Sequence, residues 1–303
     1  MALLGPLVAY PPTPRDAAGR VAEAALAALV DRAVGAGVDG IAVLGSTGGA
    51  AYLDRAQRRR VVEVAAEAVA GRVPLVAGIS AATTESVLAH ADDASRAGAD
   101  ALLLAPVSYL PLSDDEVVGL YADVTRAVDG QVWVYHNPVT TRFAFSIETL
   151  LRVSALPGIG GVKDRGSDAA EIQRRAGRLR ADAPTIEVGY SGDLLGVEGL
   201  LAGARSWHSG LASVLPSAYV AIARAAVLGD RDSVDRLLAD VRPIAEIALT
   251  EGGPRVVHAV GEILGLRTGR LPAPLLAPGP EVVARLDAAL CGLGTPRAAG
   301  ERS

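Results

Sequence analysis

The amino-acid sequence predicts an α/β protein, a (β/α)8 (TIM) barrel with a C-terminal helical segment. Short apolar runs alternate with longer Ala-rich stretches of helical spacing, which is the pattern of βαβ units and a parallel sheet. Eight such units in about 215 residues favour a closed barrel over an open, doubly wound sheet. An open sheet that binds a dinucleotide would have a G-x-G-x-x-G motif after its first strand, and this sequence has none there.

The predicted units follow one another in order along the chain. Helix stops that contain glycine, such as GAGVDG and RAGADA, precede several of the apolar runs. We expect strands at residues 5–10, 40–44, 75–78, 101–104, 132–135, 160–163, 186–190 and 206–210. We expect the helices between them at residues 21–35, 54–70, 84–97, 113–128, 146–155, 168–180 and 193–202.

After Pro216 the pattern of strands ends and only helical patterns follow. These helices, broken by Gly and Pro, are expected at residues 219–228, 233–248, 255–264 and 282–290. We therefore divide the chain into a barrel that carries the active site, residues 1–225, and a helical segment packed on it, residues 226–303. The last stretch, residues 294–303, is expected to be frayed.

The composition excludes several classes of protein. Half of the 303 residues are hydrophobic, enough for a sizeable core, and the formal net charge of -5 gives no sign of a nucleic-acid or membrane-surface partner. No apolar stretch is long enough to span a bilayer, and the start lacks the basic region of a signal peptide. The single cysteine, Cys291, allows no intrachain disulfide, which is typical of a reducing, cytoplasmic setting.

The lysine content of the chain is unusual. Lys and Arg together number 29, and Lys163 is the only lysine among them. Arginine can replace lysine where only a positive charge is needed, but a guanidinium does not deprotonate in proteins and cannot act as a neutral nucleophile. An ordinary surface lysine is the plainer interpretation, so the sequence around Lys163 has to decide between the two.

The active site of a βα barrel lies at the carboxyl ends of its strands. Residues 45–49, Gly-Ser-Thr-Gly-Gly, end the second expected strand, Tyr135 ends the fifth and Lys163 ends the sixth. A buried lysine has a lowered pKa and can attack a carbonyl as a neutral amine, and a nearby tyrosine can relay protons. The Gly-Ser-Thr-Gly turn offers backbone amides and two hydroxyls to an anion such as a carboxylate.

Each feature has a plainer explanation when it is taken alone. The glycine-rich turn is of a common kind, and it is not a phosphate-binding P-loop because no G-K-[ST] follows. We interpret Asp164 and Asp193 as helix caps, and the arginines at 58–60 as the solvated face of a helix. The four histidines are scattered without metal-ligand spacing, so we expect no metal site.

Taken together, the motifs resemble those of the dihydrodipicolinate synthase / N-acetylneuraminate lyase family of pyruvate-dependent class I aldolases. The family's pyruvate-carboxylate loop resembles GVDGIAVLGSTGG, its tyrosine motif resembles YHNP and its Schiff-base motif resembles GVKD. Two further family segments resemble SGD and the C-terminal GRLPAPLLAP, in the same order. The resemblance covers nearly the whole chain.

The resemblance implies a role for each matched residue. Lys163 would form a Schiff base with a 2-oxo acid, and Tyr135 would shuttle protons and support the imine. The carboxylate of the substrate would be held by Ser46, Thr47 and Gly48. Members of the family use no metal or organic cofactor, and they are usually homodimers or homotetramers.

The sequence departs from dihydrodipicolinate synthases at positions that shape the substrate pocket. Ser108 stands where those synthases have a tyrosine that crosses the dimer, and Tyr109 comes one position later. Thr140 stands where they have an arginine that binds the carboxylate of the aldehyde substrate. Three residues of the eighth strand are also expected to line the pocket, namely Trp207, His208 and Ser209. The departures argue against an authentic dihydrodipicolinate synthase.

We therefore expect a lyase that acts on a small-molecule 2-oxo acid through a Lys163 imine, with pyruvate-dependent aldol cleavage or condensation as the leading reaction. Because the synthase-specific tyrosine and arginine are both missing, a Schiff-base dehydratase or deaminase of a hydroxylated 2-oxo acid is the alternative. A dehydratase or deaminase would be distinguished from an aldolase by the absence of pyruvate among its products. A third hypothesis is a non-catalytic barrel with a binding or regulatory role, which the retention of Lys163 and Tyr135 disfavours.

Overall fold

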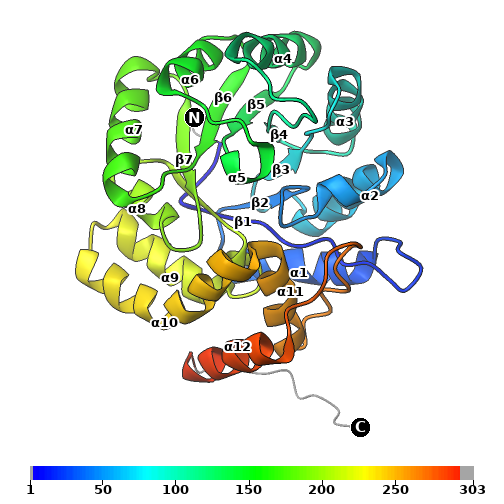
Figure 1. The fold of residues 1–303 in the computed structure, drawn as a ribbon, viewed down its shortest axis with the longest axis vertical. Coiled ribbons are helices and arrows are strands. Elements are labelled where there is room, and N and C mark those ends of the chain that lie inside the picture. The colour runs from blue at the N-terminus through cyan, green and yellow to red at the C-terminus, as the bar shows by residue number, and fades with distance from the viewer. Residues whose placement is uncertain (1–2, 294–303) are drawn as a thin grey trace.

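The computed structural model describes residues 3–293, and its strands form a closed parallel barrel of eight, as predicted (Figure 1). Each strand pairs with the next one along the chain, and β8 pairs with β1 to close the sheet. The strands are β1 (Leu7–Ala9), β2 (Gly40–Val43), β3 (Leu75–Gly78), β4 (Ala101–Leu104), β5 (Gln131–Tyr135), β6 (Ile159–Asp164), β7 (Glu187–Ser191) and β8 (Ser206–Ser209). Every one of them overlaps a predicted apolar run.

Helices alternate with the strands and cover the outside of the barrel (Figure 1). A capping box formed by Ser113 and Glu116 shows why one of them begins where it does, because each side chain binds the other residue's backbone amide. The helices of the barrel are α1 (Glu23–Gly35), α2 (Arg55–Val69), α3 (Thr84–Arg96), α4 (Asp114–Ala127), α6 (Ile147–Ser154), α7 (Ala169–Asp182) and α8 (Gly196–Leu201). Three short helices were not predicted, namely α5 (Pro138–Thr141), η1 (Ala50–Tyr52) and η2 (Leu211–Ser213).

The C-terminal segment is helical, as predicted, and lies along one side of the barrel (Figure 1). Its helices are α9 (Pro216–Val227), α10 (Arg231–Glu251), α11 (Gly253–Ile263) and α12 (Pro280–Gly292). The predicted boundary after residue 225 falls within α9, so the division at that point stays a prediction. The expectation that residues 294–303 are frayed lies outside the described residues.

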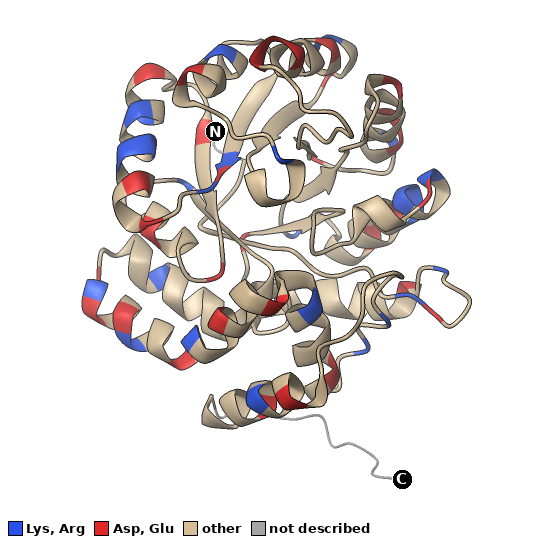
Figure 2. Ribbon diagram, in the orientation of Figure 1, with Lys and Arg blue, Asp and Glu red and all other residues tan. Residues whose placement is uncertain are grey.

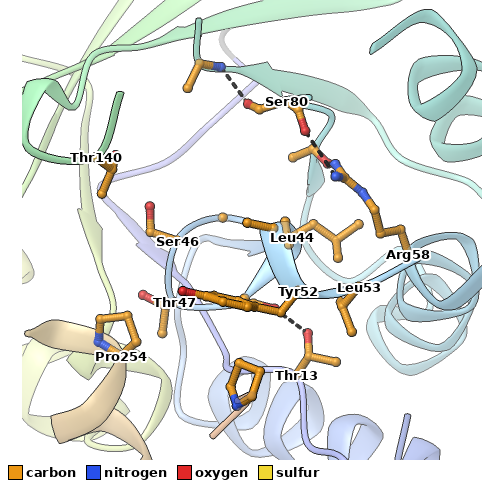
Figure 3. Close-up of a pocket in the computed structure, with 18 of the residues that line it drawn as sticks. Thr13, Leu44, Ser46, Thr47, Tyr52, Leu53, Arg58, Ser80, Thr140 and Pro254 are labelled. Atoms are coloured by element: carbon orange, nitrogen blue, oxygen red, sulfur yellow. Dashed lines mark hydrogen bonds between the residues drawn. The ribbon is translucent and has the colours of Figure 1, made fainter. Parts of the chain in front are cut away.

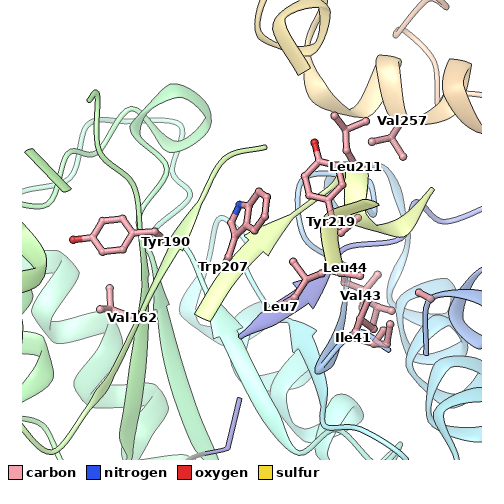
Figure 4. Packing of buried hydrophobic residues seen from close by; sticks show 14 of the residues in the cluster. Leu7, Ile41, Val43, Leu44, Val162, Tyr190, Trp207, Leu211, Tyr219 and Val257 are labelled. Carbon is pink, nitrogen blue, oxygen red and sulfur yellow. The ribbon is translucent and has the colours of Figure 1, made fainter. Parts of the chain in front are cut away.

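Two layers of buried side chains form the core, one inside the barrel and one between the barrel and its helices. Alternate residues of a strand face opposite sides of the sheet, so each strand contributes to both layers. The inner layer includes Tyr10, Trp133 and Tyr135. The outer layer includes Trp207 and Tyr219, whose ring centres are 5.0 Å apart (Figure 4). The barrel is therefore filled below its mouth, and an open site can lie only at the carboxyl ends of the strands.

Charged residues of both signs lie mostly on the outer helices and loops (Figure 2). Several form ion pairs at the surface, such as Arg60 with Glu23 at 2.8 Å and Arg55 with Asp93. Within residues 3–293, no helix is long and apolar enough to cross a membrane.

Candidate active site

Lys163 and Tyr135 lie side by side at the carboxyl ends of β6 and β5, where they are direct partners in the parallel sheet. Lys163 is buried, with 5% of the residue exposed. Its Nζ lies 3.8 Å from the centre of the Tyr135 ring and 3.8 Å from the centre of the Tyr10 ring. The structure thus brings the predicted pair together and adds Tyr10, which was not predicted although it ends the first expected strand.

Burial and neighbouring groups together shift the pKa values of Lys163 and Tyr135. Burial lowers the pKa of Lys163, because an ammonium is poorly solvated there, and the nearby Tyr135 and Asp193 offset this only in part. The lowered pKa favours the neutral amine, which is the form that adds to a carbonyl. Burial also raises the pKa of Tyr135, but the Lys163 charge and hydrogen bonds with Ser46 and Asn137 outweigh it, so the pKa of Tyr135 is lowered overall.

The Tyr135 hydroxyl is held in place by two neighbours. The Asn137 Nδ2 donates a hydrogen bond to it at 2.9 Å, and the Ser46 Oγ lies 3.3 Å away. Asn137 comes from the turn after β5, whereas Ser46 comes from the loop after β2. The hydroxyl therefore connects the lysine to the loop that was predicted to hold a carboxylate.

The loop after β2 is a tight turn whose backbone leaves donors free. Leu44 adopts a positive φ of 59°, which is rare for a residue with a side chain. Gly48 has to be glycine, because an added Cβ would lie 2.8 Å from the Leu44 backbone nitrogen. Within the described part of the chain, the amides of Thr47 and Gly48 donate to no acceptor. Together with the Ser46 and Thr47 hydroxyls, these amides suit a carboxylate.

A cavity of about 690 Å³ opens beside Tyr135 and the β2 loop (Figure 3). Thr140 lies above Ser46 and Thr47 in this view, and Pro254 lies below them (Figure 3). Lys163 is not among the lining residues, but its amine lies 3.8 Å from the centre of the ring of Tyr135, which does line the cavity. The volume is in the range of small-molecule sites, and the walls combine apolar side chains with a few polar groups.

The predicted residues of strands four and five take different positions. Thr140 lines the cavity, where its Oγ1 donates to the Asn137 carbonyl at 3.2 Å. Ser108 and Tyr109 are not among the residues that line it, although Val107 is. Tyr109 is 98% exposed.

The three predicted residues of β8 do not line the cavity. Trp207 faces outward, where it packs on Tyr219 and donates from Nε1 to the Gly192 carbonyl at 2.7 Å (Figure 4). Ser209 also faces outward and donates to the Asp193 carboxylate at 2.6 Å. Asp193 is engaged in this way and does not cap α8, so the predicted helix start at 193 is wrong and α8 begins at Gly196.

His208 packs inside the barrel, with its ring centre 5.8 Å from those of Tyr10 and Trp133. Its Nδ1 lies 2.9 Å from the Tyr10 hydroxyl, and its Nε2 lies 2.9 Å from the Ser206 Oγ. Burial and the Lys163 charge place the pKa of His208 well below its usual range, so the ring is neutral. Gly189 leaves room for this arrangement, because an added Cβ would collide with both Ser206 and His208.

A buried ionic cluster lies behind the two central residues and was missed by the sequence analysis. Asp164 is fully buried, accepts a hydrogen bond from His136 Nδ1 at 2.7 Å and pairs with Arg175 at 2.8 Å. Burial raises the pKa of Asp164, but the partners outweigh it and lower the pKa overall. Since His136 follows Tyr135 and Asp164 follows Lys163, the pair fixes β5 against β6 where the site needs it. Asp164 is thus an ion-pair partner, not a helix cap.

The prediction that the arginines at 58–60 form a solvated face is wrong for Arg58. It is buried and donates to the carbonyls of Gly78 and Ser80 at 2.9 and 3.0 Å. Burial lowers its pKa to about 10. Arg58 thereby satisfies carbonyl groups at the carboxyl end of β3, and it lines the cavity there.

Comparison with known proteins agrees with this geometry. The model of the dihydrodipicolinate synthetase family matches residues 4–290. An uncharacterized DapA-like lyase of Halobacterium salinarum is 34% identical and covers 86% of this chain and 84% of its own. A 4-hydroxy-tetrahydrodipicolinate synthase of Hyphomonas neptunium is 30% identical, with 91% and 95% covered. The crystal structure of a dihydrodipicolinate synthase from Agrobacterium tumefaciens is 40% identical and superposes with a TM-score of 0.89 over 96% of this chain and 98% of that chain.

The family match therefore extends over the barrel and most of the C-terminal segment, including the strand ends that carry Lys163, Tyr135 and the β2 loop. Within residues 3–293, no three His, Cys, Asp or Glu side chains are grouped so as to hold a metal ion. This chain belongs to the dihydrodipicolinate synthetase family and is a lyase of the class I aldolase type.

Proposed function

We propose that this enzyme acts on a 2-oxo acid through a Schiff base on Lys163, and that it cleaves or forms a carbon–carbon bond to pyruvate. The observation that carries the proposal is the position of the Lys163 amine, buried between two tyrosine rings at 3.8 Å and with a lowered pKa. A neutral amine in this position can add to a ketone, and the cationic imine that follows is a strong electron sink.

In the cleavage direction, Nζ adds to C2 of the 2-oxo acid and the carbonyl oxygen leaves as water. The C3–C4 bond then breaks, and its electron pair moves into an enamine between C2 and C3. The proton of the C4 hydroxyl passes to Tyr135, and the C4 fragment leaves as an aldehyde. Tyr135 returns the proton to C3, and water releases pyruvate and the free amine. Condensation is the same sequence reversed.

The carboxylate of the 2-oxo acid would bind the β2 loop, where the amides of Thr47 and Gly48 are without acceptors in the described chain. Ser46 would serve both parts of the site, because its hydroxyl lies 3.3 Å from the Tyr135 hydroxyl. A neutral hydroxyl at Thr140, in place of a cation, supports a partner aldehyde other than that of the synthases.

Reductive trapping tests the proposal. Borohydride added with pyruvate should fix one reduced pyruvate on Lys163, as read by intact mass and peptide mapping. A lysine that stays unmodified with every 2-oxo acid offered contradicts the imine and favours a non-catalytic barrel. An adduct with a hydroxylated 2-oxo acid whose turnover releases no pyruvate selects the dehydratase or deaminase reaction instead.

Chelation with EDTA is expected to leave the rate of the enzyme unchanged, because the imine itself withdraws the electrons that a metal ion would otherwise have to accept. The measurement is the initial rate before and after dialysis against the chelator. Activity that is lost on dialysis and returns with an added divalent metal contradicts the absence of a cofactor.

We further propose a homodimer or homotetramer that holds the loop after β4 between subunits. Tyr109 is 98% exposed and Leu110 is 68% exposed, an apolar pair that a monomer would leave in water. The double substitution of Tyr109→Ser with Leu110→Ser should lower the molar mass measured by light scattering. Leu228→Ser, at a residue 82% exposed beyond α9, is the matched control and should leave the mass unchanged. Equal masses for the loop variant and the unmodified protein contradict this interface.

A cytoplasmic location is likewise a proposal, and the single cysteine of the chain supports it.

A further inference from the structure

The charges that line the cavity are all of one sign. Of the residues that the structure describes, the cavity lining includes Arg15, Arg58 and Arg255 and no Asp or Glu. None of the three arginines is within ion-pair distance of a carboxylate in the described part of the chain, whereas Arg55 and Arg60, on the same helix as Arg58, both form ion pairs. A cavity with unbalanced positive charge attracts anions.

Among residues 3–293, backbone carbonyls are the only hydrogen-bond partners of these three guanidinium groups. Arg15 Nε donates to the Gly19 carbonyl at 2.9 Å, and Arg255 donates to the carbonyls of Leu276 and Glu251, each at 3.2 Å. A carbonyl orients a guanidinium but does not neutralise it. Each group keeps further N–H donors, since a guanidinium has five in a planar fork that fits a carboxylate or a phosphate.

Two of the three arginines gather at the end of the cavity built by the C-terminal segment. Arg255 and His258 lie one turn apart on α11, and both line the cavity. The Nδ1 of His258 donates to the Gly269 carbonyl at 3.1 Å. Gly269 in turn packs so closely on Arg15 that an added Cβ would lie 2.6 Å from its backbone nitrogen. Arg15, Arg255 and His258 therefore belong to one corner.

This corner adjoins the loop that would hold the carboxylate of the 2-oxo acid. An added Cβ on Gly210 would lie 3.0 Å from the Thr47 Oγ1 and 3.6 Å from a methyl group of Val257, so α11 lies over the β2 loop. A three-carbon acid fills little of a cavity of about 690 Å³, given that a water molecule takes about 30 Å³ in the liquid. The cavity therefore has room for a longer substrate that reaches from Tyr135 and the β2 loop to Arg15 and Arg255.

We propose that the substrate carries a second anionic group, a carboxylate or a phosphate, at the end remote from C2, and that Arg255 and Arg15 bind it. The inference rests on the proposed imine function and adds to it the chemical class of the substrate. Thr140 offers no charge on the opposite wall, so the second anion is recognised by the C-terminal segment and the loop after β1.

Matched pairs of 2-oxo acids test the inference. Borohydride trapping is run with 2-oxoglutarate against 2-oxopentanoate, and with 2-oxoadipate against 2-oxohexanoate, which differ only in a terminal carboxylate or methyl group. The acid with two carboxylates should reach half-maximal trapping at a concentration at least about tenfold lower. Added salt should reduce this ratio. A ratio near one for both pairs overturns the inference.

Substitutions test whether Arg255 and Arg15 cause the preference for the acid with two carboxylates. Arg255→Gln and Arg15→Gln should each bring the ratio toward one, because trapping of the diacid weakens and trapping of the monoacid does not. Arg126→Gln, at an exposed arginine paired with Asp123, is the control and should keep the ratio. A ratio that survives both cavity substitutions overturns the assignment. Trapping with 2-oxo-4-phosphonobutanoate decides between a carboxylate and a phosphate as the second anion. Half-maximal trapping at a lower concentration than with 2-oxoglutarate indicates a phosphate.

The two proposals fail in different ways. Pyruvate that is trapped while the diacids gain nothing leaves the imine function intact and overturns the second anion. If no acid forms an adduct, the imine function fails, and calorimetry with glutarate and pentanoate then decides the inference alone. Tighter binding of glutarate that Arg255→Gln abolishes supports the anion site, and equal binding of the two acids overturns it.

Discussion

Replacing Lys163 with arginine is expected to reduce turnover by at least about 10⁶, the lower range of enzymatic rate accelerations. Arginine keeps the positive charge and much of the volume, and its planar group can stack between the rings of Tyr10 and Tyr135. It cannot supply a neutral amine, so no imine forms. The measurement is the rate of pyruvate release or consumption, with the melting temperature as a check that the fold is retained.

A lysine placed elsewhere in the site makes a sharper control. The double variant with Lys163→Arg and Arg165→Lys keeps one lysine in the chain but moves its amine two residues along, beyond the end of β6. It should be as inactive as the single variant, because the amine no longer lies beside the Tyr135 hydroxyl. Turnover by either variant would contradict the imine mechanism.

Replacing Tyr135 with phenylalanine is expected to lower the rate by about 10² to 10⁴, the range for a positioned acid–base group. The ring that packs on the Lys163 amine remains, and only the hydroxyl is lost. Asn137 Nδ2 then loses its acceptor at 2.9 Å, and Ser46 loses the link to the proton relay. Single-turnover trapping should show slow imine formation with pyruvate, although the final amount of adduct approaches that of the unmodified enzyme.

Tyr121 provides the matched control for this substitution. It is a buried tyrosine of α4 whose hydroxyl donates to the Leu104 carbonyl, outside the cavity lining. Tyr121→Phe removes the same atom and should lower the melting temperature without a comparable loss of rate. If Tyr135→Phe leaves the rate unchanged, or if both variants lose rate equally, Tyr135 has no special part in proton transfer.

The alternation of short apolar runs with helical stretches, together with the motifs at the ends of the runs, was enough to predict the barrel. Eight such runs leave few other folds for a chain of this length. The same patterns also placed Lys163 and Tyr135 at one end of the sheet. They could not show which residues of β8 face inward, since Ser-Trp-His-Ser has no clear alternation of apolar and polar residues. Trp207 and Ser209 were assigned to the cavity because they end the eighth strand where the sequence departs from the synthases, and the structure turns both toward the helices.

The parts of the site that the sequence did not predict depend on contacts between residues far apart in the sequence. The bond between Tyr10 and His208 spans 198 positions, and the one between His136 and Asp164 spans 28. Neither pair carries a local signal, because each residue alone is equally compatible with an ordinary core or a solvated position. Only the register of β5 on β6 shows that the ionic cluster supports Lys163.

The restriction of lysine to one buried position has a practical consequence for labelling chemistry. All other side-chain cations that belong to Lys or Arg are guanidinium groups, so a reagent specific for side-chain amines can modify only Lys163. Since that residue is 5% exposed and its amine lies against Tyr135, which lines the cavity, we expect the reagent to reach it from the cavity side. An acid that occupies the active site would protect Lys163 from such a reagent. A library of metabolites could therefore be screened for binding without an assay of turnover.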